Sequence, residues 1–307
     1  SRTIYLSKNI TLAKYAGFCY GVKRAVETVK KLKEENPNKN VYVLGELIHN
    51  SQVISELEKL GIKTIHDISE ADSGICVIRS HGASPAVIKE IQDSGLELVD
   101  LTCLDVKKVQ QQAIQLAKEG DFVVIVGKAD HPEVIAIKAN AEQYTDKIFV
   151  ASDIEHLKQV EDKIKAHKKV GVVVQTTQRI ETLQNIVSYL ITISKEMHLV
   201  NTICQSTKMR QTEAKELAQK NDLVIVVGSK KSANTTHLAE ILTGITSTIH
   251  IEKDDELNQY KDLIEKSKNI AITAGASTPQ NIIDKVYKKI EGGQEWQMHK
   301  WMISKNY

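Results

Sequence analysis

Residues 103–127 read CLDVKKVQQQAIQLAKEGDFVVIVG, and this stretch decides the fold. After the cysteine, apolar residues recur every three or four positions, which is typical of a helix that packs along one face. The continuously apolar run FVVIV that follows favours a strand covered on both faces of a sheet. Residues 204–228 repeat this order of cysteine, helix and strand, and both stretches end on a glycine 24 positions after the cysteine. The chain therefore contains an internal repeat.

A third copy of this segment begins at Cys19 and ends at Gly45. Polar residues recur at equivalent places in the three copies. Four positions after the three glycines stand His49, His131 and Ser232. The next apolar strands of the three copies lead to His81, to Thr176 and to Ser277. Polar side chains therefore follow the strands in every copy.

The predicted fold is α/β, with three units related by a pseudo-threefold axis and with mostly parallel sheets. Alternating strands and helices favour parallel strands joined by right-handed crossovers. We expect units at residues 1–103, 104–203 and 204–290, followed by a C-terminal tail at 291–307. Ligands of such sheets bind beyond the carboxyl ends of the strands, which is where the recurring polar residues fall.

The cysteines indicate a metal centre. A threefold arrangement would bring Cys19, Cys103 and Cys204 to one point, whereas Cys76 lies within an apolar strand and is expected in the core. Thiolates select zinc, copper(I) or iron–sulfur clusters, and the chain has no CxxC pair of the kind that structural zinc sites usually contain. Three thiolates on a 4Fe-4S cluster would leave one iron open to substrate as a Lewis acid.

The residues around the predicted centre suit an anionic substrate. Helix N-termini after the strand ends favour phosphate, and Glu133 is a candidate acid. Taken singly, the histidines have an ordinary explanation as surface or core residues, and the serines and asparagine as helix N-caps. Their recurrence at strand ends favours a ligand site. The candidate donors to an anion are His49, His81, His131, Ser232, Asn234 and Ser277.

Composition excludes several classes of protein. The 307 residues carry a net charge of +2, so no strong field points to nucleic acid as a partner. No apolar run approaches the length of a membrane span, and the first residues, SRTIYLSKN, lack the apolar stretch of a secretory signal. We therefore expect a cytoplasmic protein without a nucleic-acid or membrane partner.

The ordered motifs resemble the 4-hydroxy-3-methylbut-2-enyl diphosphate reductase family of the non-mevalonate isoprenoid pathway. The resemblance covers residues from about 10 to about 290. It is carried by GFCYGVKRAV around Cys19, HN at 49–50, SHG at 80–82, TC at 102–103, HPEV at 131–134, QTT at 175–177, SANT at 232–235 and AGAS at 274–277.

This resemblance implies an iron–sulfur oxidoreductase that removes the hydroxyl of an allylic diphosphate, with electrons from a ferredoxin or flavodoxin. The products would be isopentenyl diphosphate and dimethylallyl diphosphate. It implies a 4Fe-4S cluster on Cys19, Cys103 and Cys204, and a diphosphate site made by His49, His81, His131, Ser232, Asn234 and Ser277. It further implies that Glu133, with His131 beside it, delivers protons and that Thr176 orients the substrate hydroxyl.

Some positions differ from the pattern expected of the family. They are Leu104 and Asp105 after the second cysteine, Gln205 after the third, and Ala233, which removes a hydroxyl from the diphosphate site. These differences leave an alternative open, namely a related iron–sulfur reductase or dehydratase that acts on a different small substrate.

Overall fold

The structure, a computed structural model, describes the backbone of residues 8–304 and the side chains as far as Gly292. The chain divides into two compact units. The central unit is Tyr20–Thr207, and the terminal unit joins Ser1–Cys19 to Lys208–Tyr307.

The central unit contains two four-stranded sheets. The strands of the first sheet are β2 (Val41–Leu44), β3 (Ile62–Ile65), β4 (Ile75–Ile78) and β5 (Glu97–Asp100). The accompanying helices are α1 (Tyr20–Glu35), α2 (Ser51–Lys59), the 3-10 turn η1 (Ile68–Glu70) and α3 (Pro85–Asp93).

The second sheet of the central unit repeats this arrangement. Its strands are β6 (Phe122–Val126), β7 (Ile148–Ala151), β8 (Lys169–Val174) and β9 (Glu196–Leu199). Its helices are α4 (Leu104–Lys118), α5 (Pro132–Glu142), α6 (Ile154–Leu157), η2 (Lys158–Val160), α7 (Glu161–Lys165) and α8 (Ile180–Ile193).

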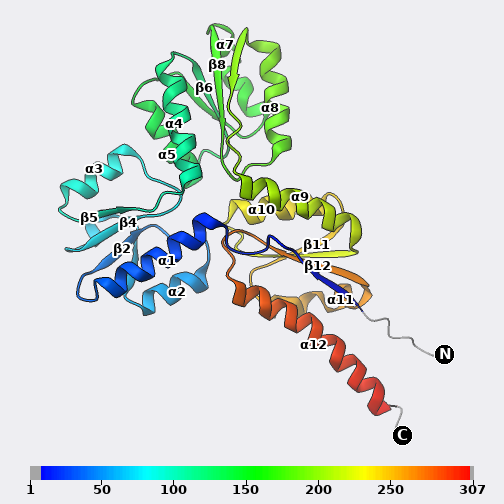
Figure 1. Ribbon diagram of the computed structural model, residues 1–307. Helices are drawn as coiled ribbons and strands as arrows, with labels where there is room; N and C mark the ends of the chain where they lie inside the picture. The colour runs from blue at the N-terminus through cyan, green and yellow to red at the C-terminus, as the bar shows by residue number, and fades with distance from the viewer. Residues whose placement is uncertain (1–7, 305–307) are drawn as a thin grey trace. The chain divides into compact units, whose positions relative to one another are not determined.

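The terminal unit contains the third sheet, which takes one strand from the start of the chain. Its strands are β10 (Leu223–Val227), β11 (Ser247–Ile251), β12 (Asn269–Ala274) and β1 (Asn9–Leu12). The helices that follow Cys204 are α9 (Gln205–Lys220), α10 (Ala233–Thr243), η3 (Asp254–Tyr260), α11 (Lys261–Lys266) and α12 (Gln280–Ser304). Figure 1 shows β1, in dark blue, beside β12, in orange, and the two strands pair in parallel from Asn9 with Asn269 to Leu12 with Ile272.

The three sheets share one topology. Their strand orders are β3-β2-β4-β5, β7-β6-β8-β9 and β11-β10-β12-β1, so the same position is taken by β5, β9 and β1. Every strand pairing among the described residues is parallel. The predicted α/β fold with three equivalent, parallel-stranded repeats is confirmed. The proposed boundaries at residues 103, 203 and 290 stay a prediction. The strand β1, from the start of the chain, lies in the sheet of the third repeat.

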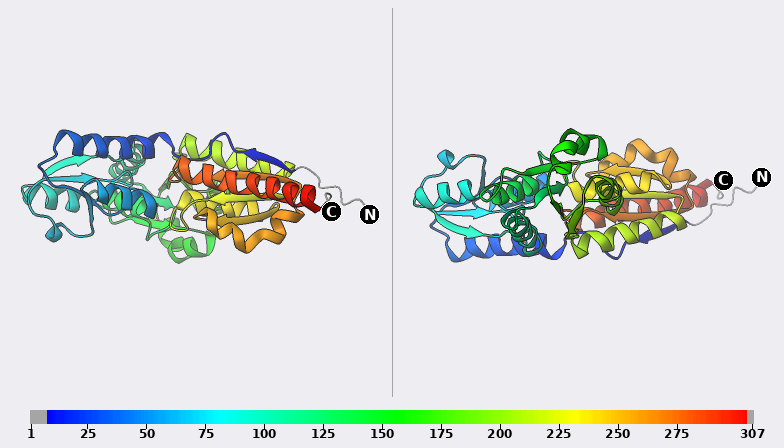
Figure 2. Two further views of the ribbon diagram at one scale, coloured as in Figure 1. Left: turned by 90° about the horizontal axis from the view of Figure 1, so that it is seen from below. Right: turned by 90° about the horizontal axis from the view of Figure 1, so that it is seen from above.

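The repeated apolar pattern explains why the elements pack as they do. The α4 residues Val106, Val109 and Ala113 are buried, as their spacing predicts. All five residues of β6 and of β10 are buried, which fits strands covered on both faces. Figure 2 shows α12, in red, alongside the strands of the third sheet, where Ile283 and Val286 join their core cluster.

The predicted tail is continuous with a helix, since α12 runs from Gln280 to Ser304. The side chains from residue 293 onward, including both tryptophans, lie outside the described residues, as do residues 305–307 altogether. Within the part of the chain that is described, none of the helices combines the length and the apolar character that crossing a bilayer requires.

Candidate active site

The three cysteines occupy equivalent turns. The backbone N–H of Cys103 donates to the carbonyl of Ser80 over 3.1 Å, and that of Cys204 donates to Thr176 over 3.1 Å. In the terminal unit the N–H of Cys19 donates to the carbonyl of Ala276 over 3.3 Å. All three acceptors lie two residues after a strand, namely β4, β8 and β12. The repeat therefore places each predicted ligand between a strand-end turn and the start of a helix.

The thiols of these three cysteines are partly exposed, whereas that of Cys76 is not. Cys76 is fully buried in β4, and burial raises the pKa of its thiol to about 11. Burial also raises the pKa of Cys204, against the opposing effect of hydrogen bonds from Thr207, whose hydroxyl lies 3.1 Å from the sulfur. These surroundings therefore favour the protonated thiol of Cys204.

Three histidines of the central unit lie together at the strand ends. The ring centroids of His49 and His81 are 5.1 Å apart, and those of His81 and His131 are 5.3 Å apart. One ring nitrogen from each lies within 4.8 Å of the others. The positions follow from local structure: Asn50 caps α2 directly after His49, and His131 caps α5 by accepting the N–H of Glu133 at Nδ1.

The surroundings of His81 disfavour its charged form. The pKa of His81 is held well below its ordinary value, first by burial and then by repulsion from Arg79 and from the two neighbouring histidines. Its Nδ1 is buried with no hydrogen-bond partner among the described residues. A bound anion would offset the repulsion among these groups and favour the protonated form of His81.

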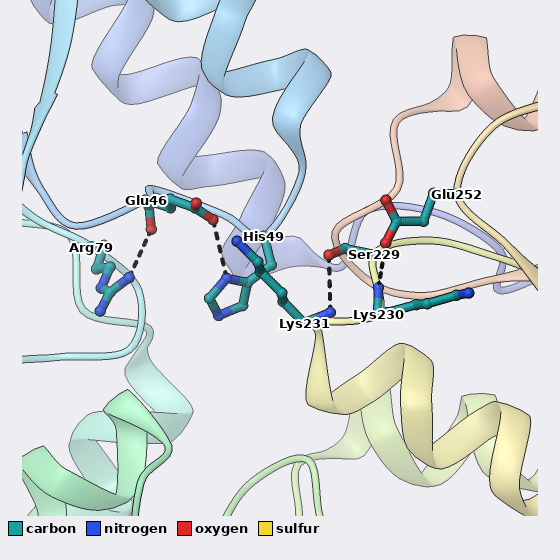
Figure 3. Close-up of polar contacts among 7 residues, drawn as sticks. All are labelled: Glu46, His49, Arg79, Ser229, Lys230, Lys231 and Glu252. Carbon is teal, nitrogen blue, oxygen red and sulfur yellow. Dashed lines mark hydrogen bonds and ion pairs between the residues drawn. The ribbon is translucent and has the colours of Figure 1, made fainter.

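Two charged residues that the sequence analysis did not single out support the cluster. Figure 3 shows Glu46 and Arg79 beside His49, with Glu46 Oε2 lying 3.4 Å from His49 Nδ1. Arg79 donates through one guanidinium nitrogen to the backbone carbonyl of Glu46 over 3.1 Å. Their positions, three residues before His49 and two before His81, are the available sequence signal. Glu46 and Arg79 therefore place one acidic and one basic group directly against the histidine cluster.

Glu133 and Thr176 form a buried pair in the central unit. Glu133 is 2% exposed, and its Oε1 accepts the N–H of Thr176 over 2.7 Å. Its Oε2 accepts the hydroxyl of Thr176 over 2.8 Å. Burial raises the pKa of Glu133 to about 7, although the bonds from Thr176 oppose the shift, and nearby Asp105 raises it further. A carboxyl with this pKa holds and releases a proton at neutral pH, which is the property of a general acid.

A second group of predicted residues lies in the terminal unit. Ser232 caps α10 by accepting the N–H of Thr235, and Asn234 Oδ1 accepts the N–H of Ala276 over 3.0 Å. The Ser277 hydroxyl is buried without a hydrogen-bond partner in the described part of the chain. The loop between β10 and α10, which leads to Ser232, is held by two hydrogen bonds. The Lys230 N–H donates to Glu252, and the Lys231 N–H donates to the Ser229 hydroxyl (Figure 3). An unsatisfied buried hydroxyl at a helix start suits a ligand with acceptor oxygens.

The predicted residues thus form two groups, each within its own unit. The central unit holds Cys103, Cys204, the three histidines, Glu133 and Thr176. The terminal unit holds Cys19, Ser232, Asn234 and Ser277. The predicted meeting of all three cysteines involves both units and stays a prediction, as do the individual roles of the residues.

Fold and site define a class: an α/β protein of three equivalent repeats, with cysteine, histidine and carboxyl side chains beyond the ends of parallel strands. A family model described as "LytB protein" matches residues 10–291. The chain belongs to the LytB protein family.

Relatives and solved structures agree with this assignment. The chain is 42% identical over 282 residues to a protein of Pelobacter propionicus named 4-hydroxy-3-methylbut-2-enyl diphosphate reductase, covering 92% of this chain and 97% of that relative. A Geotalea uraniireducens protein of the same name is 42% identical over 283 residues, covering 92% and 96%.

Among solved structures, the chain resembles one described as (E)-4-hydroxy-3-methyl-but-2-enyl diphosphate reductase, the terminal enzyme of the non-mevalonate pathway. The TM-score is 0.68 at 36% identity, over 93% of this chain and 99% of the other. A reductase structure from Plasmodium falciparum matches with a TM-score of 0.83 at 27% identity, over 92% and 87%.

Proposed function

We propose that this chain is an oxidoreductase that removes the hydroxyl of 4-hydroxy-3-methylbut-2-enyl diphosphate. Two electrons and two protons convert the substrate into water plus isopentenyl diphosphate or dimethylallyl diphosphate. The observation that carries the proposal is the buried Glu133–Thr176 pair beside the histidine cluster, in a chain 42% identical to reductases of that name. The names of the relatives favour this reaction over a related reductase or dehydratase that acts on another substrate.

The donor set fits a 4Fe-4S cluster. Cys19, Cys103 and Cys204 have partly exposed thiols, and each precedes the first residue of a helix, where the helix dipole favours a thiolate. We propose that these three cysteines hold the cluster. When bound, the cluster supplies one-electron chemistry and a Lewis-acidic iron that carries no protein thiolate.

The chain's own residues bind the substrate and move its protons. His49, His81 and His131 present imidazole nitrogens to the diphosphate from the central unit, and Ser232, Asn234 and Ser277 present polar groups from the terminal unit. Glu133 delivers a proton to the leaving hydroxyl, because hydroxide is a poor leaving group until it is protonated. Thr176 fixes the direction of the Glu133 carboxyl through its N–H and hydroxyl. A ferredoxin or flavodoxin supplies the electrons.

An anaerobic assay tests the proposal. Reconstituted protein is mixed with reduced methyl viologen and the allylic diphosphate, and the two isoprenoid diphosphates are quantified. Product formation supports the proposal. Oxidation of the dye at the background rate by cluster-containing protein, together with intact substrate, would exclude it. Parallel reactions with the corresponding free alcohol measure how far recognition depends on the diphosphate.

A further inference from the structure

A second cluster of potential ligands lies near the amino-terminal ends of β6 and β8 in the second sheet, whereas the candidate active site lies beyond the carboxyl ends of the strands. One ligand atom each from Glu119, Asp121 and His198 lies within 4.8 Å of the others. Glu119 and Asp121 come just before β6, and His198, the third of the four residues of the edge strand β9, pairs in register with Gly171 near the start of β8. The residues of the candidate active site instead follow the carboxyl ends of the strands, so the two clusters are separate.

Backbone geometry brings these side chains together. Gly120 adopts a φ of 83° between the two acidic residues, and such a turn favours glycine. Gly171 of β8 pairs in register with His198. A Cβ built on Gly171 would lie 2.9 Å from Asp121 Oδ2, so the missing side chain leaves the space that the carboxylate fills. The carboxylate therefore lies over the strand position beside His198.

Asp121 is not satisfied by the groups around it. Its side chain is 2% exposed, and Oδ2 has no hydrogen-bond partner among the described residues. Lys169 Nζ lies 3.9 Å from Asp121 Oδ1 and 3.9 Å from a carboxylate oxygen of Glu119, beyond hydrogen-bond length. Burial accordingly raises the pKa of Asp121, and the negative charges of Glu119 and Glu196 raise it further, while Lys169 and His198 lower it. A buried carboxylate oxygen without a partner has a desolvation cost that a cation would remove.

We propose that Glu119, Asp121 and His198 form a binding site for a divalent metal ion of the zinc type. One imidazole nitrogen and two carboxylate oxygens are a donor set that zinc accepts, with water in the fourth position. The exposed positions of Glu119 and His198 leave a path for the ion to enter. The ammonium of Lys169 stands close to the same carboxylates and lowers the affinity by repulsion.

The site would fasten an edge strand. β9 lies at the edge of its sheet, pairs only with β8 among the described strands, and leads along the chain to Cys204. A metal bound to His198 and to the two carboxylates would join β9 to the turn between α4 and β6. The strand β6 is an inner strand of the same sheet. Binding to the folded state alone raises the thermal stability of the protein. This inference does not depend on the proposed reaction.

Calorimetric titration with Zn²⁺ tests the site in cluster-loaded protein under anaerobic conditions. The wild type should bind one more equivalent than His198→Ala, and Lys169→Met should bind that equivalent at least about threefold more tightly. The matched control is His66→Ala, since His66 is also an exposed histidine of the central unit, and it should titrate as the wild type does. Saturating zinc should raise the melting temperature by about 3–6 °C in the wild type and in the control, but not in His198→Ala.

Two results would overturn the proposal. One is an identical zinc stoichiometry and thermal shift in the wild type and in His198→Ala. The other is the absence of an anomalous-scattering peak beside His198 in crystals soaked with zinc. Since His198 is exposed, its replacement leaves the core intact and loss of binding cannot be ascribed to unfolding. Asp121→Asn gives a second measure, because the amide keeps the shape but lacks the charge, and it should weaken zinc binding at least about tenfold.

Discussion

Replacement of Glu133 by glutamine should slow turnover strongly while leaving substrate binding nearly unchanged. The amide can keep both contacts, since its oxygen accepts the Thr176 N–H and its nitrogen donates to the Thr176 hydroxyl, in place of the bonds of 2.7 and 2.8 Å. It cannot, however, hold an acidic proton. The variant therefore isolates proton delivery from the shape and packing of the site.

The magnitude follows from the pKa of Glu133, which is raised to about 7. Close to half of the carboxyls then carry a proton at pH 7. A positioned general acid contributes about 10²–10⁴ in rate, so we expect kcat to fall at least ~10²-fold with little change in KM. Because only the protonated carboxyl donates, wild-type turnover should decline as the pH rises through about 7, and the residual turnover of the variant should lack this decline.

The assay is anaerobic turnover of the allylic diphosphate at saturating reduced methyl viologen. Glu142→Gln is the matched control, because Glu142 is exposed at the end of the same helix and should behave as wild type. Iron content and diphosphate affinity are measured on all three proteins. Near-normal turnover in Glu133→Gln would refute the reasoning, and the proton would then have to reach the hydroxyl through Thr176, the diphosphate or water.

Three further changes test the remaining parts of the site. Serine at Cys19, Cys103 or Cys204 should abolish iron and sulfide binding. Cys76→Ser should retain the iron and sulfide, because Cys76 is fully buried in β4. Equal loss in all four variants would contradict the threefold arrangement. His81→Ala should weaken diphosphate binding about 10- to 100-fold, the equivalent of one charge-assisted hydrogen bond. It should also reduce the number of protons taken up when the diphosphate binds, as measured by calorimetry in buffers of different ionisation enthalpy. Gly275→Ala should lower the free energy of unfolding by about 1–3 kcal/mol, because the new Cβ would lie 1.8 Å from the Thr235 hydroxyl; an unchanged denaturation midpoint would show that the loop yields.

The fold was predictable because its information is local and occurs three times. The apolar spacing of α4 and the continuous run of β6 each specify an element without reference to the rest of the chain. The sequence did not predict that β1 pairs with β12, because Asn9–Leu12 is too short to indicate its partner, and 260 residues separate Asn9 from Asn269. Such a pairing depends on tertiary packing rather than on local pattern.

The residues of the site were predictable as types but not as an electrostatic system. Repetition singled out His49, His81 and His131, yet the contacts of Glu46 and Arg79 with this cluster depend on side-chain geometry. Likewise, the sequence placed a carboxyl at Glu133, but its raised pKa results from burial together with the charge of Asp105. Burial of a polar group is a property of the packed structure, so these features could not be read from the order of residues.

The burial that raises the pKa of Glu133 also makes its ionised form unfavourable in the folded protein. Glu133 has a folded-state pKa of about 7 and an ordinary value of 4.5, so between these values the folded state binds more protons than the unfolded state. Stability contributed by Glu133 is therefore complete below pH 4.5 and is lost as the pH rises through about 7, a change of about 3 kcal/mol. In substrate-free protein the free energy of unfolding, relative to that of Glu133→Gln, should fall by about this amount between pH 4.5 and pH 8. Parallel pH curves for the two proteins would mean that Glu133 ionises as an exposed carboxyl does, and it could not then serve as the acid.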